Sequence, residues 1–320
     1  MDAKKRGSFF SSFNKLGSIG SVLIALVVIS ILWGIKTPYY FTFSNLQNIC
    51  VYISANGIMA AGLTLTLVLG GLDLSQMSLM AMAGMIAGIA FQHGANGFVM
   101  LLIAAGIGIV GGAVNGILIS VAGINPFIAT LGTQLVYRGL AFIVTNGKYI
   151  TVKDPFIHFI GKEKIIGLPS MFWLMLIIYI VLAFIMKYTQ YGRNIYSVGG
   201  NKTASRLSGI YVQKVEIISY IIAGLCSGMA AILYIAQGSV ALNNAGTGSE
   251  MDIMTAAILG GLSLSGGKGT VFNTFMGITL LSVIANGMSL LSISSYYQML
   301  IKGLILIVAV FVDSLRESRA

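Results

Sequence analysis

Charged residues are scarce in this chain of 320 residues. Asp, Glu, Lys and Arg together make up 9% of the sequence, and hydrophobic residues make up 57%. Soluble domains carry roughly 25% charged residues, because their surface faces water. The composition therefore excludes a soluble globular protein and predicts an integral membrane protein.

Cysteine and histidine are also rare, with two residues of each type. Cys50 and Cys226 both lie in apolar stretches, where a cysteine is usually a small buried hydrophobe. His93 and His158 are far apart and have no cluster of acids or cysteines around them. Neither pair has the ligand spacing of a metal site. We expect no metal and no cofactor.

Motifs for catalysis or nucleotide binding are missing. The sequence has no Gly-x-Ser-x-Gly elbow and no His-Glu-x-x-His helix. The glycine-rich stretch around Lys268 resembles a phosphate-binding loop, but Leu262 and Gly269 replace the required glycine and hydroxyl residue. No polar segment is long enough to be a catalytic domain. We predict that the chain is not an enzyme, and that another polypeptide binds any ATP that is used.

The apolar residues come in blocks of about 20 residues, the length of a membrane-spanning helix, without the alternation of a barrel strand. They predict an all-α, polytopic membrane helix bundle of about ten helices, within a range of about 8–11. Together they form a single domain over residues 1–320. The blocks are Ser18–Ile35, Leu46–Leu69, Leu72–Phe91, Phe98–Val121, Phe127–Val144, Met171–Tyr188, Val215–Ile235, Met251–Leu262, Val271–Leu291 and Tyr296–Val312. The eighth block is too short to cross alone, which predicts a broken or re-entrant helix.

Basic residues are concentrated between the blocks, which explains the net charge of +10 without nucleic-acid binding. Positive residues near span ends mark the cytoplasmic side. Most of them fall on one side by parity: Lys4, Lys5, Arg6, Lys15, Lys187, Arg193, Lys202, Arg206, Lys214, Lys268, Arg316 and Arg319. We therefore predict that both termini and the loop 187–214 are cytoplasmic. The segment 146–170 fits poorly, because it places four lysines on the opposite side.

The sequence contains an internal echo. Gly70–Ser75 matches Gly260–Ser265 at five of six positions. Three further correspondences follow in the same order: Asn115 with Asn286, Gln134 with Gln298, and Arg138 with Lys302. Repeats that place glycine-broken helices at matching points are a common way to build a transport pathway. The offset of six helices implies parallel halves, whereas an inverted repeat needs an odd offset.

Polar residues inside the apolar blocks are candidates for a solute pathway. They are Asn56, Asp73, Asn115, Arg138, Asn286 and Lys302. The two cations need partners at membrane depth, and the acids available are Asp73, Glu250 and Asp252. Bonding between helices is the alternative role for all of these polar residues. The glycines Gly108, Gly112 and Gly116, spaced by four, favour close helix packing over ligand binding.

Several stretches together resemble the ribose-type sugar permeases, the membrane subunits of ABC importers. They are NGIMAAGLTLTLVLGGLDLS (Asn56–Ser75), NPFIATLGT (Asn125–Thr133), YGRNIYSVGGNKTASRLSGIYV (Tyr191–Val212), AGTGSEMD (Ala245–Asp252), LGGLSLSGGKGTV (Leu259–Val271) and SSYYQMLIKG (Ser294–Gly303). Gln76-Met77, Ser249 and Met251 depart from the usual family pattern. The resemblance covers nearly the whole chain. It implies a permease subunit for a monosaccharide in the bacterial inner membrane.

The resemblance also implies partners, namely two cytoplasmic ATPase subunits, an extracytoplasmic sugar-binding protein and a second permease copy. The loop 187–214 resembles the segment that couples the permease to the ATPase. Its candidate residues are Gly199, Gly200, Asn201, Lys202, Ala204, Arg206, Leu207 and Gly209. A short helix from about Lys202 to Leu207 fits a groove on the ATPase. Alternatively, the basic loop merely fixes the topology.

Two other functions fit the composition. One is an ion-coupled secondary transporter of a small polar solute, in which Asp73 or Asp252 is the coupling carboxylate. The other is a scaffold without a pathway, which predicts no solute flux under any condition.

Overall fold

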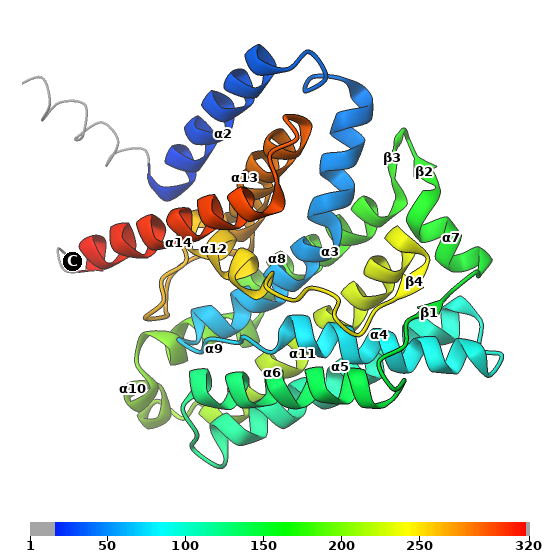
Figure 1. Cartoon of the computed structure of the whole chain (residues 1–320). Helices are drawn as coiled ribbons and strands as arrows, with labels where there is room; N and C mark the ends of the chain where they lie inside the picture. The colour runs from blue at the N-terminus through cyan, green and yellow to red at the C-terminus, as the bar shows by residue number, and fades with distance from the viewer. Residues whose placement is uncertain (1–16, 318–320) are drawn as a thin grey trace, which may run out of the picture.

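The computed structural model describes residues 17–317 (Figure 1). Within that range the helices are α2 (Gly17–Lys36), α3 (Phe43–Val68), α4 (Gln76–Gln92), α5 (Gly97–Ser120), α6 (Pro126–Ile143), α7 (Pro155–Lys162), α8 (Ser170–Tyr188), α9 (Gln190–Gly200), α10 (Lys202–Leu207), α11 (Val212–Gly238), α12 (Glu250–Gly260), α13 (Val271–Leu290) and α14 (Ser295–Glu317). Two short antiparallel pairs join β1 (Ile150–Thr151) to β4 (Val240–Ala241) and β2 (Lys164–Ile165) to β3 (Leu168–Pro169). The predicted charges at Lys4, Lys5, Arg6, Lys15 and Arg319 lie outside the described residues.

Each of the ten predicted apolar blocks is a helix, which confirms the all-α membrane fold. Six of these helices are long and apolar enough to cross a membrane: α2, α3, α5, α8, α11 and α13. The helix α4 is shorter because the chain is unwound between α3 and α4. The helix α12 has 11 residues, as the short eighth block predicted. Its last residue is Gly260. The next residue, Gly261, has a positive φ of 99°, and this left-handed conformation ends the helix.

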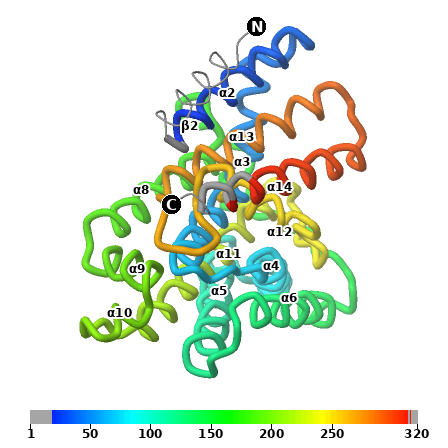
Figure 2. The backbone as a smooth tube through the Cα atoms, turned by 90° about the vertical axis from the view of Figure 1, so that its left-hand side faces the viewer, coloured from blue at the N-terminus to red at the C-terminus, as the bar shows by residue number. Residues whose placement is uncertain are grey.

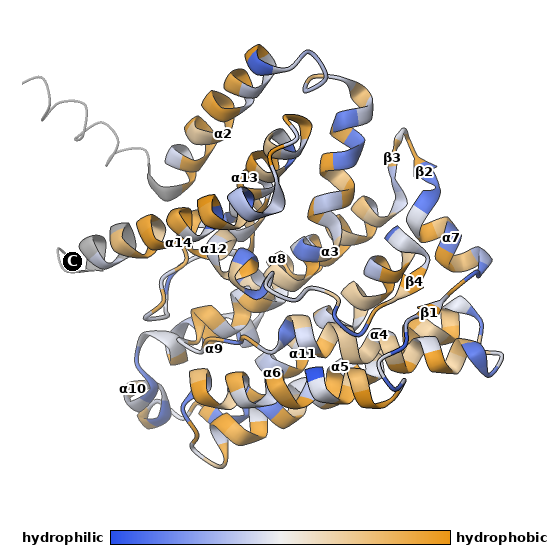
Figure 3. Ribbon diagram, viewed as in Figure 1, coloured by the Kyte–Doolittle hydropathy of each residue, from blue (hydrophilic) through white to orange (hydrophobic). Residues whose placement is uncertain are grey.

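The helix α3 forms the centre of the bundle. It packs against α8, α11, α12 and α13, and 83% of the residues in its most apolar 18-residue stretch are buried. By contrast, α2 is an outer helix, which packs mainly on α13 and buries only Val22 among residues 19–36. Figures 1 and 2 both show α2 away from α5 and α6. In Figure 3, α2 is apolar along most of its length, as expected of a helix that faces lipid.

The helices α5 and α11 approach each other closely through glycines. A Cβ added to Gly108 would overlap the carbonyl oxygen of Gly224, and one added to Gly112 would overlap that of Tyr220. A Cβ added to Gly116 would lie 2.8 Å from the Cα of Ile217. This confirms that the glycine repeat serves helix packing, because only the absence of side chains lets the two backbones come so near.

The loops between helices gather at two opposite ends of the bundle. At one end, the amide of Gly267, after α12, donates to the carbonyl of Val68, at the end of α3, over 2.8 Å. At the other end, the antiparallel pair of β1 and β4 joins the segment before α7 to the segment after α11. The loops after the second and eighth apolar blocks therefore lie at one end, and those after the fifth and seventh lie at the other, as the topology prediction requires.

The lysine-rich segment 146–170 lies at the end that carries β1 and β4. Two of its four lysines bond to neighbouring elements: Lys164 Nζ donates to Gln47 Oε1 over 2.8 Å, and Lys162 Nζ donates to the carbonyl of Gln237 over 3.4 Å. These bonds give Lys162 and Lys164 a local role in closing this end of the bundle.

In both stretches of the sequence echo the chain comes to the end of a helix, but a different position of the motif is left-handed in each. Gly70 has a φ of 77° in the first stretch, whereas the left-handed residue of the second stretch is Gly261, one position later in the alignment. Asn115 lies on the second helix after its break, and Asn286 lies on the first. The likeness in structure is therefore clearest at the glycine breaks themselves.

Candidate functional site

The predicted coupling helix is present with the predicted bounds. The helix α10 runs from Lys202 to Leu207, and Asn201 caps it by accepting the amide of Ala204 at Oδ1 over 2.9 Å. A second helix, α9, precedes it where we expected a loop. Its cap is Thr189, whose Oγ1 accepts from the amide of Gly192 over 3.1 Å. The Thr-x-x-Gly start was a signal that the sequence offered for α9.

Most of α10 is open to its surroundings. Lys202, Ala204 and Arg206 are exposed, and Leu207 exposes 85% of its surface. In contrast, Ser205 is buried and bonds to Ser197 of α9 over 2.9 Å. Figure 3 shows α10 as a hydrophilic helix, and Figure 2 places it at the periphery of the molecule. The helix thus offers a polar ridge with one exposed leucine to a partner.

Two contacts fix α9 and α10 to the bundle. Lys202 Nζ lies 2.6 Å from Glu216 Oε1 of α11, and this carboxylate is buried while the lysine side chain is about half exposed. On α9, the hydroxyls of Tyr191 and Ser219 are 2.6 Å apart. Burial raises the pKa of Tyr191 above its ordinary value, so the phenol stays neutral and bonded. The chain then turns into α11 at Gly209, where φ is 82°.

The C-terminal end of α9 rests on the two glycine breaks. A Cβ on Gly199 would overlap the carbonyl oxygen of Val68 and would lie 2.9 Å from the amide nitrogen of Gly267. Since the Gly267 amide also donates to that carbonyl, the ends of α3 and α9 and the loop before α13 form one contact, here called the break junction. A shift of α9 must therefore move the end of α3 or the loop after α12.

Asp73 and Asn115 are brought together by Ser75. Asp73 Oδ1 accepts from the Ser75 amide over 3.0 Å and from its hydroxyl over 2.7 Å, and Asn115 Nδ2 donates to the Ser75 oxygen over 2.7 Å. All three side chains are buried. Thr130 of α6 donates to the carbonyl of Leu72 in the same break. This network shapes the unwound segment between α3 and α4.

Both buried cations find acids on the first turn of α12. Arg138 Nη2 lies 3.6 Å from Glu250 Oε1, and Lys302 Nζ lies 2.6 Å from Asp252 Oδ2. Two of the three acids that the sequence offered are therefore the partners. Asp73 forms no ion pair within residues 17–317. Acids in the first turn also suit the helix dipole.

The surroundings of Arg138 and Lys302 differ. Arg138 Nη1 donates to the carbonyls of Asn243 and Ala245 over 3.0 and 2.8 Å, which holds the segment between β4 and α12. Lys302 and Asp252 instead line a cavity between α12 and α14. The echo in sequence therefore matches two cations that are paired in the same way but placed in different environments.

The remaining pathway candidates lie on α3 and α13. Asn286 exchanges two hydrogen bonds with Asn45, over 2.8 and 3.0 Å, so its amide joins α13 to α3. Asn56 is partly exposed, one turn after Tyr52 on the same face of α3. Tyr52 is close enough to Lys302 and Asp252 to interact with both. Asn56 is not among the residues that line the Lys302 cavity, and its Nδ2 donates to the carbonyl of Tyr52 over 3.5 Å.

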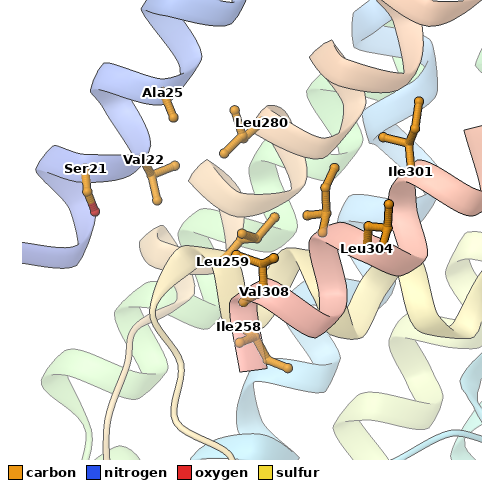
Figure 4. Close-up of a pocket in the computed structure, with 11 residues that line it drawn as sticks. Ser21, Val22, Ala25, Ile258, Leu259, Leu280, Ile301, Leu304 and Val308 are labelled. Atoms are coloured by element: carbon orange, nitrogen blue, oxygen red, sulfur yellow. The ribbon is translucent and has the colours of Figure 1, made fainter. Parts of the chain in front are cut away.

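A second hollow in the bundle is apolar. It has a volume of about 430 Å³ and is formed by α2, α12, α13 and α14. Figure 4 shows Val22 of α2, Leu280 of α13 and Leu304 of α14 around it. The polar area is small because the lining is almost entirely aliphatic. A hollow of this kind suits lipid chains rather than a hydrophilic solute.

No cluster of three potential metal ligands is found among the described residues. The polar groups of the site are hydroxyls, amides and paired charges, which can bind hydrophilic solutes by hydrogen bonds.

Residues 45–310 match the family described as the permease component of the branched-chain amino acid transport system. The ribose import permease protein RbsC of Escherichia coli K12 is 38% identical over 299 residues, which cover 92% of this chain and 93% of that protein. The ribose import permease of Bacillus subtilis is 33% identical over 312 residues, which cover 97% and 96% of the two chains.

An arabinose permease gives the same result. The L-arabinose transport system permease protein AraH of Escherichia coli K12 is 32% identical over 306 residues, which cover 96% of this chain and 93% of that one. No solved structure matches the chain significantly. The similarity extends over all the helices that carry the break junction and the paired charges. The chain belongs to this family of transport permeases and is a multi-pass membrane subunit of a transport system.

Proposed function

We propose that this chain is the membrane permease of an ABC importer for a monosaccharide, of the ribose type. Its similarity to permeases named for ribose and arabinose, over more than 90% of its length, supports the substrate class. Residues 1–320 act as one transmembrane domain in the bacterial inner membrane, with both termini in the cytoplasm. Two copies enclose a central pathway. The chain has no catalytic site of its own and takes its energy from separate ATPase subunits.

The segment 187–214 couples the ATPase to the pathway. The exposed ridge of α10 docks on the ATPase, and α9 passes its movement to the break junction. The observation that carries this proposal is the close contact of Gly199 with the carbonyl of Val68, beside Gly267. Helices that end at a shared contact can adopt two packings, and ATP binding selects one of them through its differential affinity. Specificity for the sugar lies largely in the extracytoplasmic binding protein.

The ion-coupled alternative has less support. The relatives are named as import permeases of ribose and arabinose transport systems. Asp252 is paired with Lys302 at 2.6 Å, so it is not a lone carboxylate awaiting a cation. Asp73 is buried and bonded to Ser75.

The test is uptake in proteoliposomes. We expect radiolabelled D-ribose or L-arabinose to accumulate when the ATPase subunits, the binding protein and ATP are all present. Accumulation by the chain alone in a sodium or proton gradient, with no further gain from ATP and the partners, would contradict the proposal. Vesicles without ATP serve as the control.

The ion pair between α10 and α11 gives a separate prediction. Lys202→Glu places two carboxylates together, and we expect it to lower ATP-dependent uptake by about two- to fivefold, since a half-exposed pair contributes about 0.2–1 kcal/mol. The charge-swapped double variant Lys202→Glu with Glu216→Lys should recover most of the uptake. An equal loss in single and double variants would show that Lys202 acts on the partner rather than through Glu216.

A further inference from the structure

The cavity between α12 and α14 has polar side chains, including an ion pair, in a wall that is otherwise apolar. Its volume is about 450 Å³. Its polar side chains come from the segment before α12, from α12 itself and from α14: Thr247, Ser249, Asp252, Thr255, Ser295, Gln298 and Lys302. We call this space the α12–α14 cavity. Its size falls within the range of about 300–1,000 Å³ that is typical of small-molecule sites.

The ion pair in this cavity shows that it faces water rather than lipid. Lys302 is the eighth residue of α14, so it lies roughly 10 Å along the helix from its start at 1.5 Å per residue. The side chains of Lys302 and Asp252 still expose 20% and 15% of their surface. Charges at membrane depth face the bundle interior or a water-filled space, because lipid does not solvate them. We therefore expect the α12–α14 cavity to be hydrated.

The helix α14 separates this compartment from the apolar hollow shown in Figure 4, called the apolar groove below. Gly303 and Lys302 line the α12–α14 cavity, whereas Leu304 and Val308 line the groove. Adjacent residues of one helix thus meet two environments. The change from a polar to an aliphatic lining around a single helix is the arrangement expected where a solute pathway lies beside the lipid.

The charges of the cavity indicate the class of solute. Asp252 and Lys302 neutralise each other, so the wall offers strong acceptors and donors without a net charge. An ammonium has three donors and a carboxylate accepts several bonds, so the bond between them leaves capacity on both for further partners. A neutral polyol, whose hydroxyls both donate and accept, matches that wall. An apolar side chain or a lone ion would leave these groups poorly matched.

Arg138 is not part of the cavity wall. Its Nη1 donates to the carbonyls of Asn243 and Ala245, and its Nη2 lies 3.6 Å from Glu250. The two cations of the sequence echo therefore have separate roles. Arg138 holds the segment that leads into α12, and Lys302 presents its ammonium to the cavity.

We infer that the α12–α14 cavity is a transient binding site for the sugar inside the permease, and that Asp252 and Lys302 hydrogen-bond its hydroxyls. The inference rests on the proposed function, because it assigns the contact that the monosaccharide makes on its way through. Tyr52 of α3 also interacts with Lys302 and Asp252. The sugar meets both a donor and an acceptor at this point and is held without net charge, which favours passage over trapping.

Filling the cavity tests the inference. Gly303 lines it, and none of the described atoms lies within 4 Å of a Cβ added there, so the backbone has room for the first atom of a side chain and we expect Gly303→Leu to fill the cavity. We expect the maximal rate of ATP-dependent uptake of D-ribose or L-arabinose to fall about tenfold in the assembled complex. The matched control is Gly132→Leu on α6, a glycine with equally open surroundings, and it should transport normally.

Water access is measured independently of transport. In a chain whose Cys50 and Cys226 are replaced by alanine, Gly303→Cys should react with a charged methanethiosulfonate. Leu304→Cys, in the aliphatic groove, should react at least about tenfold more slowly, since the reagent needs a hydrated thiolate. Equal reactivity at the two positions would overturn the hydrated compartment.

The outcomes separate the inference from the proposed function. Absence of ATP-dependent sugar uptake by the unaltered complex would remove the proposed function and the sugar site with it. Normal uptake by the unaltered complex, together with normal uptake by Gly303→Leu, would overturn the site and leave the importer intact. The double variant Asp252→Asn with Lys302→Gln removes both charges but keeps side chains that form hydrogen bonds. It should slow uptake from the sugar-loaded binding protein less than Gly303→Leu does. If it disturbed assembly of the complex more than uptake, that result would also count against the site.

Discussion

Replacing Gly199 by alanine is expected to lower ATP-dependent uptake by about tenfold, while the chain still inserts in the membrane. The added Cβ overlaps the carbonyl oxygen of Val68, which belongs to rigid backbone. Overpacking of this kind costs about 1–3 kcal/mol, and about 1.4 kcal/mol changes an equilibrium tenfold. The cost falls on the break junction, through which we propose that α9 transmits movement. Uptake in proteoliposomes and ATP hydrolysis by the same complex are the measurements.

The adjacent glycine is the matched control. A Cβ on Gly200 meets none of the described atoms within 4 Å, so Gly200→Ala should behave like the unaltered chain. Gly200→Glu places a charge on the exposed side of the same turn, where a partner would dock. We expect it to weaken copurification of the ATPase, in contrast to Gly199→Ala, which should keep the ATPase bound but poorly coupled. Equal uptake by Gly199→Ala and Gly200→Ala would refute transmission through the break junction.

Replacing Gly112 by leucine is expected to destabilise the helix bundle strongly. Its Cβ would overlap the carbonyl of Tyr220 on α11, and the rest of the leucine side chain would push α5 and α11 apart. The expected loss of stability is about 3 kcal/mol, a large part of the roughly 5–15 kcal/mol that holds a typical protein folded. The measurements are the yield of monodisperse protein in detergent and its apparent melting temperature.

Gly106→Leu provides the comparison on the same helix. Gly106 also lies in α5, but none of the described atoms comes within 4 Å of a Cβ placed there. The variant should therefore keep its yield and melting temperature. If both leucine variants were equally stable, close approach of α5 and α11 at Gly112 would not hold the bundle together.

The sequence by itself determined the fold class, the positions of the ten apolar helices and the packing role of one glycine repeat. Lipid removes the choice of structure for long apolar blocks, because a backbone that cannot bond to water must bond to itself as a helix. For the same reason the block at Met251–Leu262 was visibly too short, and α12 has 11 residues. The bounds of α10 came with the resemblance of the loop 187–214 to the coupling segment of sugar permeases.

The tertiary structure alone decided which polar residues meet. Arg138 and Lys302 lie 164 positions apart, yet both pair with the first turn of α12. Asp73, one of three acids that the sequence offered as partners, bonds to Ser75 instead. Pairing at this distance depends on how helices pack, and the period of a sequence carries no information about that. The seat of Gly199 on Val68, and the cavity beside Gly303, arise in the same way from contacts between helices that are remote in the chain.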